Sequence, residues 1–480
     1  MTEKTQKYEI TIGIETHVQL KTKTKLFSEV DNDARGKEPN SCVSPVDYAL
    51  PGMLPRLNGE AIKLAIRAGA AMNAKINPYS RFDRKHYFYP DSPKGYQITQ
   101  FFSPIIGEGY IELPSGKKVR IEHAHLEGDA GKLSHSDSYS LVDLNRVDTP
   151  LIEIVSMPDI TSAEEARDYC HELWRNMVYA DITNGDLYNG NMRFDVNISL
   201  KKPGVKELGT RAEIKNLNSF RSIERAVLYE YERQSKLLDK GERIIQETRG
   251  WSDATGKTTS QRSKEDAQDY RYMPEPDLPP LNLSDEFIRT VYDNCPSIAN
   301  DYRRQFHSVI ASDTLEILLD YPELMRRLAE IDEKTDRKED ISYISNLFAS
   351  VLLAEENASL LNDRLPSSSQ LIELSEMKAK KELSSTAAKE LFIKLFEEKH
   401  SSKTAKELAK ELNLIQENDS AALEKIIDIV LRNPATKKAQ EDYKSGQEKV
   451  LGFLVGQVMK ESKGKANPAT VSELLKKKLK

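Results

Sequence analysis

The chain has 480 residues, of which 38% are hydrophobic and 30% are charged, and its formal net charge is −6. These values are typical of a globular protein of roughly two to four domains, and they exclude a nucleic-acid binder that works through its overall charge. Three distant cysteines without a CxxC pair, and no apolar run near about 18 residues, indicate a reduced, cytoplasmic protein without a membrane span.

The residue pattern divides the chain into three parts. Residues 1–292 alternate polar and apolar positions and contain many turns, whereas 293–405 and 406–480 repeat apolar residues at helical spacing. The proline-rich "YMPEPDLPPLNLSDE" lies at the first boundary. We therefore predict an α+β protein with a mostly antiparallel sheet-and-helix domain, then an all-α helical domain, then a small all-α tail.

The first predicted strand, "YEITIGIETHVQL", places Glu15 and His17 on one face, opposite the apolar residues. "MRFDVNISL" repeats this pattern and places Asp195 on its polar face. Carboxylates are the ligands that Mg²⁺ prefers, so the Glu15–His17 pair could hold such an ion. An ordinary exposed strand face is the alternative.

The next segment, "DRKHYFYPDSPKGYQ", crowds rings and charges together, and its two prolines argue against a long helix. Further on, "HAHLEGDAGKLSH" adds Glu127 as a possible metal ligand and Lys132 as a cation for phosphate. A polar loop is the alternative, and the histidine and cysteine spacings match no common zinc site.

"EIKNLNSF" joins a polar strand to an amphipathic helix that Ser219 could cap. Lys215, Asn216 and Asn218 precede that helix, where amines and amides suit anions. The chain has neither a P-loop nor a GxSxG motif.

Two later segments could contact RNA. The segment that begins "QETRGW" and ends "DYRYMPEPDLPP" interleaves basic and aromatic residues, as single-strand binders do; a mobile surface loop is the alternative. Residues 432–480 contain twelve lysines and arginines against five acidic residues, which favours phosphate contact over an ordinary solvated helix face.

Nine motifs in order closely resemble the family of B subunits of bacterial glutamyl-tRNA(Gln)/aspartyl-tRNA(Asn) amidotransferases: "IGIETHVQLKTKTKLFS", "LPGMLPRLN", "DRKHYFYPDSPKGYQITQ", "EGDAGK", "SLVDLNRVDTPLIEIVSMPDI", "MRFDVNISL", "EIKNLNSF", "QETRGW" and "DYRYMPEPDLPPL". The resemblance covers nearly the whole chain. It implies a cradle-shaped front domain that binds ATP and Mg²⁺, a helical domain, and a tail that touches the tRNA body. It also implies a carbon–nitrogen ligase with glutamine as the amide donor.

In such an enzyme the side-chain carboxylate of mischarged Glu-tRNA(Gln) or Asp-tRNA(Asn) is phosphorylated and then amidated. The ammonia comes from a glutaminase A subunit, and a small C subunit completes the complex. The resemblance implies metal ligands at Glu15, His17, Glu127, Glu153 and Asp195. It implies catalytic cations at Lys132, Arg146, Arg193 and Lys215, and ATP-binding residues at Tyr87, Tyr89, Asn145, Asn216 and Asn218. The ring-rich segment would form a pocket wall and the approach of the tRNA 3′ end.

Three positions depart from the family pattern. Many relatives have paired cysteines where this chain has only Cys42, so no structural zinc is expected. His86 stands where asparagine is expected, and Asp148 stands where glycine is common. Two other functions remain open: a tRNA-binding scaffold without chemistry, which the acidic strand faces argue against, and a metal phosphohydrolase, which gives no reason for the basic tail.

Overall fold

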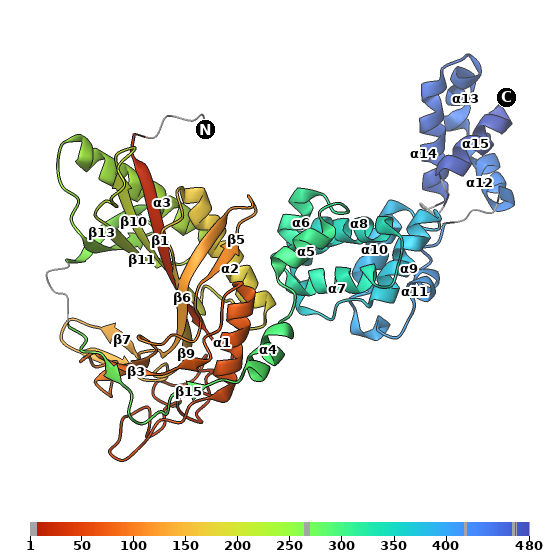
Figure 1. The fold of residues 1–480 in the computed structure, drawn as a ribbon. Coiled ribbons are helices and arrows are strands. Elements are labelled where there is room, and N and C mark those ends of the chain that lie inside the picture. The colour runs from red at the N-terminus through yellow and green to blue at the C-terminus, as the bar shows by residue number, and fades with distance from the viewer. Residues whose placement is uncertain (1–6, 264–268, 417–419, 463–465, 467, 480) are drawn as a thin grey trace. The chain divides into compact units, whose positions relative to one another are not determined.

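The computed structural model describes the chain apart from residues 1–6, 264–268, 417–419, 463–465, 467 and 480. It divides into two compact units, Met1–Asp301 and Tyr302–Lys480. Unit 1 contains sheets and helices, and every element described in unit 2 is a helix (Figure 1). The α+β prediction is therefore confirmed, whereas the division into 1–292, 293–405 and 406–480 stays a prediction. No helix in the described residues is long and apolar enough to cross a membrane.

Unit 1 is built around an eleven-stranded sheet with the order β13-β12-β11-β10-β1-β9-β6-β4-β3-β14, in which β5 also pairs with β6. Among the strands described, only β11 and β12 pair in parallel. The strands are β1 (Glu9–Gln19), β3 (Asp83–His86), β4 (Tyr96–Thr99), β5 (Gly109–Glu112), β6 (Lys118–Gly128), β9 (Pro150–Ser156), β10 (Met192–Lys201), β11 (Ala212–Leu217), β12 (Glu247–Ser252), β13 (Lys257–Ser263) and β14 (Met273–Pro274). Two small sheets pair β2 (Tyr79–Ser80) with β15 (Leu281–Asn282) and β7 (Lys132–His135) with β8 (Ser140–Asp143).

The central strand β1 has one buried face and one partly exposed face, as its alternation predicts. Ile10, Ile12 and Ile14 join an apolar core with the helices α1 (Gly59–Ala71), α2 (Ala163–Tyr179) and α3 (Phe220–Asp239). Burying a side chain of this size stabilises the fold by about 1.5–3 kcal/mol. The helices therefore cover one face of the sheet and leave the face of Glu15 and His17 free for chemistry.

Side-chain caps fix where the helices of unit 1 begin. Ser219 accepts a hydrogen bond from the Ser222 backbone N–H and caps α3, as predicted. Ser162 caps α2 in the same way through the Glu165 N–H. A further helix, α4 (Asp285–Asp293), follows the last strand.

Unit 2 is built from short helices. Its helices are α5 (Ala299–Phe306), which begins just before the unit, α6 (Ser312–Leu318), α7 (Pro322–Asp332), α8 (Lys338–Leu347), α9 (Ser368–Ala379), α10 (Ser385–Lys394), α11 (Ala405–Glu411), α12 (Ser420–Arg432), α13 (Lys437–Lys444), α14 (Leu451–Glu461) and α15 (Pro468–Leu479). The last four helices share a core of their own, which includes Leu423, Ile427, Leu454 and Leu475.

Candidate active site

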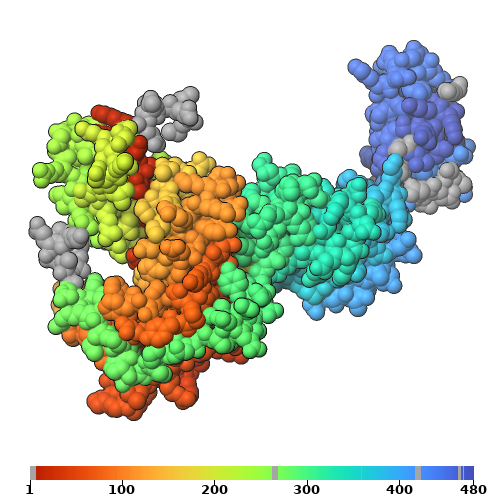
Figure 2. Space-filling view, in the orientation of Figure 1, coloured from red at the N-terminus to blue at the C-terminus, as the bar shows by residue number. Residues whose placement is uncertain are grey.

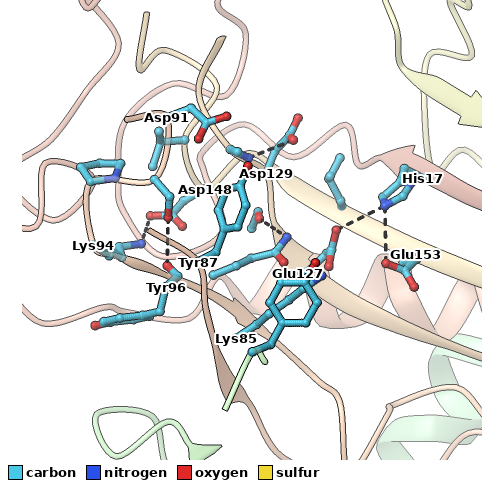
Figure 3. Close-up of a pocket in the computed structure, with 18 of the residues that line it drawn as sticks. His17, Lys85, Tyr87, Asp91, Lys94, Tyr96, Glu127, Asp129, Asp148 and Glu153 are labelled. Carbon is cyan, nitrogen blue, oxygen red and sulfur yellow. Dashed lines mark hydrogen bonds and ion pairs between the residues drawn. The ribbon is translucent and has the colours of Figure 1, made fainter. Parts of the chain in front are cut away.

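A cavity of about 420 Å³ lies on the polar face of the large sheet (Figure 3). One wall carries Glu15 and His17 from β1, Glu127 from β6 and Glu153 from β9. The opposite wall comes from the segment between β3 and β4, which is the ring-rich stretch of the sequence. A space-filling view shows a notch in unit 1 between its yellow-green and orange segments (Figure 2).

His17 is the centre of this acidic wall. Its Nε2 lies 3.4 Å from Glu153 Oε2, 3.6 Å from Glu127 Oε1 and 3.9 Å from Glu15 Oε1. Strand register explains the grouping, because His17 pairs with Glu153 across β1 and β9 and Glu15 pairs with Asp195 across β1 and β10. The potential ligand atoms of Glu15, His17 and Asp195 all lie within 4.8 Å of one another. All five residues of the expected metal site therefore come together.

The acidic wall is crowded with negative charge. Burial and the neighbouring Glu153 charge raise the pKa of Glu15 to about 7. Burial lowers the pKa of His17, but the hydrogen bond to Glu153 and the charge of Glu127 outweigh it and raise that pKa to about 9. Burial also raises the pKa of Glu153, but the hydrogen bond from His17 and the charge of His125 bring it down to about 2. Such a group of anions favours a bound cation.

Three of the expected catalytic cations lie at or beside the cavity. Lys215 and Arg193 line it, and Lys215 Nζ lies 2.8 Å from Asp195 Oδ2. Arg193 lies 3.3 Å from an Asp129 carboxylate oxygen, and Arg146 lies 2.9 Å from the same oxygen. Asp129 lines the first cavity and forms an ion pair with Arg146, which lines a neighbouring cavity. Arg146 therefore lies beside the first cavity.

Five other expected residues do not line the cavity. Tyr87 lines the cavity, but Tyr89 only contacts the Tyr87 ring at a centroid distance of 5.7 Å and is half exposed. Asn145 is buried and uses its amide to hold the Cys42 N–H and the Glu38 carbonyl, which is a structural task. The remaining three do not line the cavity and have exposed side chains: Lys132, Asn216 and Asn218.

Residues 10–289 match the family model described as the GatB/GatE catalytic domain, and residues 330–479 match the one described as the GatB domain. The chain belongs to the GatB/GatE family. Among the similar curated proteins, a B subunit of the aspartyl/glutamyl-tRNA(Asn/Gln) amidotransferase of Clostridium acetobutylicum is 42% identical over 98% of this chain and 99% of its own length. The B subunits of the enzymes with the same name from Thermodesulfovibrio yellowstonii and Coxiella burnetii are also 42% identical over 98% of this chain, covering 99% and 100% of their own lengths. The resemblance in the motifs is thereby confirmed.

The structure adds two lysines that the sequence patterns do not single out. Lys85 lines the cavity with its Nζ 4.8 Å from the centre of the Tyr270 ring. Burial lowers the pKa of Lys85, but the nearby charge of Glu127 outweighs it and raises that pKa. Lys94 also lines the cavity and forms an ion pair with Asp148. Strand alternation could have grouped Lys85 with Tyr87, but β3 is only four residues long, too short for a clear period.

Proposed function

We propose that this chain is the component of a tRNA-dependent amidotransferase that activates and amidates the amino acid on a mischarged tRNA. The substrates are Glu-tRNA(Gln), Asp-tRNA(Asn) or both, as the names of the curated relatives state for those proteins. The observation that carries the proposal is the contact of His17 with three glutamates above a sheet whose other face is a helix-covered core.

The acidic wall fits a Mg²⁺ ion. Its donors are mostly carboxylate oxygens, which this ion prefers. They form two groups of three, Glu15/His17/Asp195 and His17/Glu127/Glu153, and either group alone would leave positions for water and phosphate. Burial and the neighbouring Glu153 charge raise the pKa of Glu15 to about 7, and a cation bound beside this carboxylate would favour its charged form. Glu15, His17, Glu127, Glu153 and Asp195 would hold the ion, which would neutralise charge on the ATP phosphates.

The basic side chains of the cavity supply the rest of the phosphate site. Transfer of the γ-phosphoryl group depends mainly on positioning and on charge neutralisation. Lys85, Arg193 and Lys215 each present a cationic group to the cavity, and Lys85 makes no ion pair with a carboxylate in the part of the chain described. These cations would orient ATP and stabilise the acyl phosphate that forms on the substrate carboxylate. Ammonia then attacks the acyl carbon and phosphate leaves, which produces the amide.

A scaffold that only binds tRNA is the second candidate, and the cavity argues against it. A binder of polyanions gains affinity from cations, whereas this chain buries Glu127 and partly buries Glu15 and Glu153 at the same site.

The ammonia would come from a glutaminase A subunit, with a small C subunit completing the complex.

One assay tests the proposal. The chain is co-purified with its partner subunits, and each mischarged tRNA is incubated with ATP, Mg²⁺ and glutamine. We expect Gln-tRNA(Gln) or Asn-tRNA(Asn) to form together with ADP and phosphate. Tight tRNA binding without ADP or amide would instead identify the scaffold.

A further inference from the structure

Exposed rings gather beside the cavity, and they come from segments that are distant in sequence. Phe101 lies face to face with Tyr272, with ring centroids 3.9 Å apart and 12° between the planes. Phe102 meets Phe101 edge to face at 5.0 Å. Phe101 is 53% exposed and Phe102 is 54% exposed. We name these three residues the ring platform. Since Tyr272 covers one face of Phe101, the exposed part of Phe101 offers a further ring a place to continue the stack.

Cations are interleaved with the rings of this region. The Arg81 guanidinium lies 5.5 Å from the centre of the Phe102 ring. Arg271 lies 5.8 Å from the centre of the Phe88 ring, which is also strongly exposed. Aromatic faces beside arginine and lysine are the combination with which proteins bind unpaired nucleotides, because the rings stack on bases and the cations contact phosphates.

The ring platform is continuous with the cavity. Tyr270 lines the cavity and contacts Tyr272 edge to face at 6.1 Å. The backbone N–H of His86 donates to the Tyr270 carbonyl at 2.9 Å, which ties this segment to the end of β3. Phe101 therefore lies two ring contacts beyond Tyr270, which lines the cavity.

We propose that the ring platform stacks an unpaired base at the 3′ end of the tRNA and so places the aminoacyl group at the cavity. This inference rests on the proposed function, which requires the aminoacyl end to enter the cavity. Only unpaired nucleotides present free base faces, and the aminoacyl end of a tRNA is single-stranded. The exposed part of Phe101 would stack on the base of a nucleotide, and Arg81, which lies beside Phe102, would contact its phosphate.

The test compares two tRNAs on the assembled complex. One is full length, and the other lacks its unpaired 3′ nucleotides. In the double variant Phe101→Leu/Phe102→Leu, leucine keeps the apolar character but removes the flat ring. We expect this variant to bind full-length tRNA roughly 5- to 150-fold more weakly, the range for losing one base–aromatic stack, and to bind the shortened tRNA like the wild type. Tyr188→Leu is the control, because Tyr188 is 96% exposed outside the ring platform.

A spectroscopic readout reports stacking directly. With 2-aminopurine in place of the terminal adenosine, we expect binding to quench its fluorescence in the wild type and in Tyr188→Leu, but not in the double variant. Equal weakening of both tRNAs, unchanged binding of both, or loss of the partner subunits from the double variant would overturn the proposal. A wild-type complex that never amidates tRNA would refute the proposed function instead, so the two failures are distinguishable.

Discussion

Lys94 and Asp148 form an ion pair in the wall of the cavity, and Asp148 holds a backbone conformation that favours glycine. Its φ is +58°, which lies in the left-handed region. The Asp148 N–H donates to the Asp129 carbonyl, and the Asp148 carbonyl accepts from the Leu26 N–H, both at 2.9 Å. These hydrogen bonds fix the conformation, and the left-handed φ is one that glycine adopts freely. The Asp148 carboxylate, which glycine lacks, forms the ion pair with Lys94.

Two variants separate the backbone strain from the ion pair. Asp148→Gly and Asp148→Ala both leave Lys94 without its partner, but only glycine adopts the left-handed conformation freely. We expect Asp148→Ala to be less stable than Asp148→Gly by about 1 kcal/mol, measured by urea unfolding. Equal unfolding midpoints would show that the backbone at this position carries no strain.

The sequence predicts which residues lie on the polar face of the sheet, because strand alternation assigns Glu15, His17 and Asp195 directly. It does not predict which of them meet, because this depends on the strand order around β1. The contact between His17 and Glu153 exists only because β9 pairs with β1 in one register. Before the structure, therefore, only the family resemblance identifies Glu153 as a candidate metal ligand.

Two asparagines show where the sequence predicts function least well. Asn145 is expected to bind ATP, yet its amide satisfies backbone groups of the loop at 38–42. Nothing in a sequence distinguishes an amide that binds a ligand from one that binds the backbone. Asn216 has a left-handed φ of +67° and an exposed side chain, and a pattern of residues does not report such a conformation.

The metal proposal predicts a selective loss of the ATP-dependent step. His17→Ala removes the residue that contacts three glutamates, so we expect amidation to fall by about a hundredfold or more. Glutamine hydrolysis by the partner glutaminase should continue at a similar rate. Mn²⁺ binding, followed by electron paramagnetic resonance, should weaken in parallel and gives a readout that does not depend on activity.

Thr11→Ala is the matched control for His17→Ala. Thr11 lies on the same face of β1 but outside the acidic wall. We expect its amidation and Mn²⁺ binding to match the wild type. Normal amidation in His17→Ala would remove His17 and its glutamates from the proposed phosphoryl-transfer site.

The thiol of Cys295 should react slowly at neutral pH. Burial, together with the charge of Asp301, raises the pKa of Cys295 to about 11 against the opposing charge of Arg67. At pH 8 only a small fraction is thiolate, so we expect alkylation by iodoacetamide to be at least about tenfold slower than for a free thiol. The rate should rise as pH increases toward 11. Peptide mapping by mass spectrometry, with protein unfolded in urea as the reference, measures this; equal rates in both states would contradict the shift.

The last four helices, α12 to α15, offer a separate prediction, because they have their own apolar core and a local excess of basic residues. The structure also shows where to cut. The helix α11 belongs to the preceding helices, since the Gln416 N–H that follows it donates to the Glu382 carbonyl at 2.8 Å. Deleting residues 417–480 therefore removes these four helices, a shorter segment than the predicted tail 406–480, and leaves the preceding helices intact.

We expect this deletion to weaken tRNA binding by the assembled complex and to flatten its dependence on salt, because each lost phosphate contact removes a share of counterion release. Amidation should drop at low tRNA concentration and recover partly at high concentration, since binding energy from the tRNA body also helps to place the aminoacyl end. Glutaminase activity without tRNA should stay the same. The measurement is tRNA affinity across a salt series, with amidation rates at two tRNA concentrations. If affinity and salt slope both match the full chain, the lysines of the tail form an ordinary solvated surface.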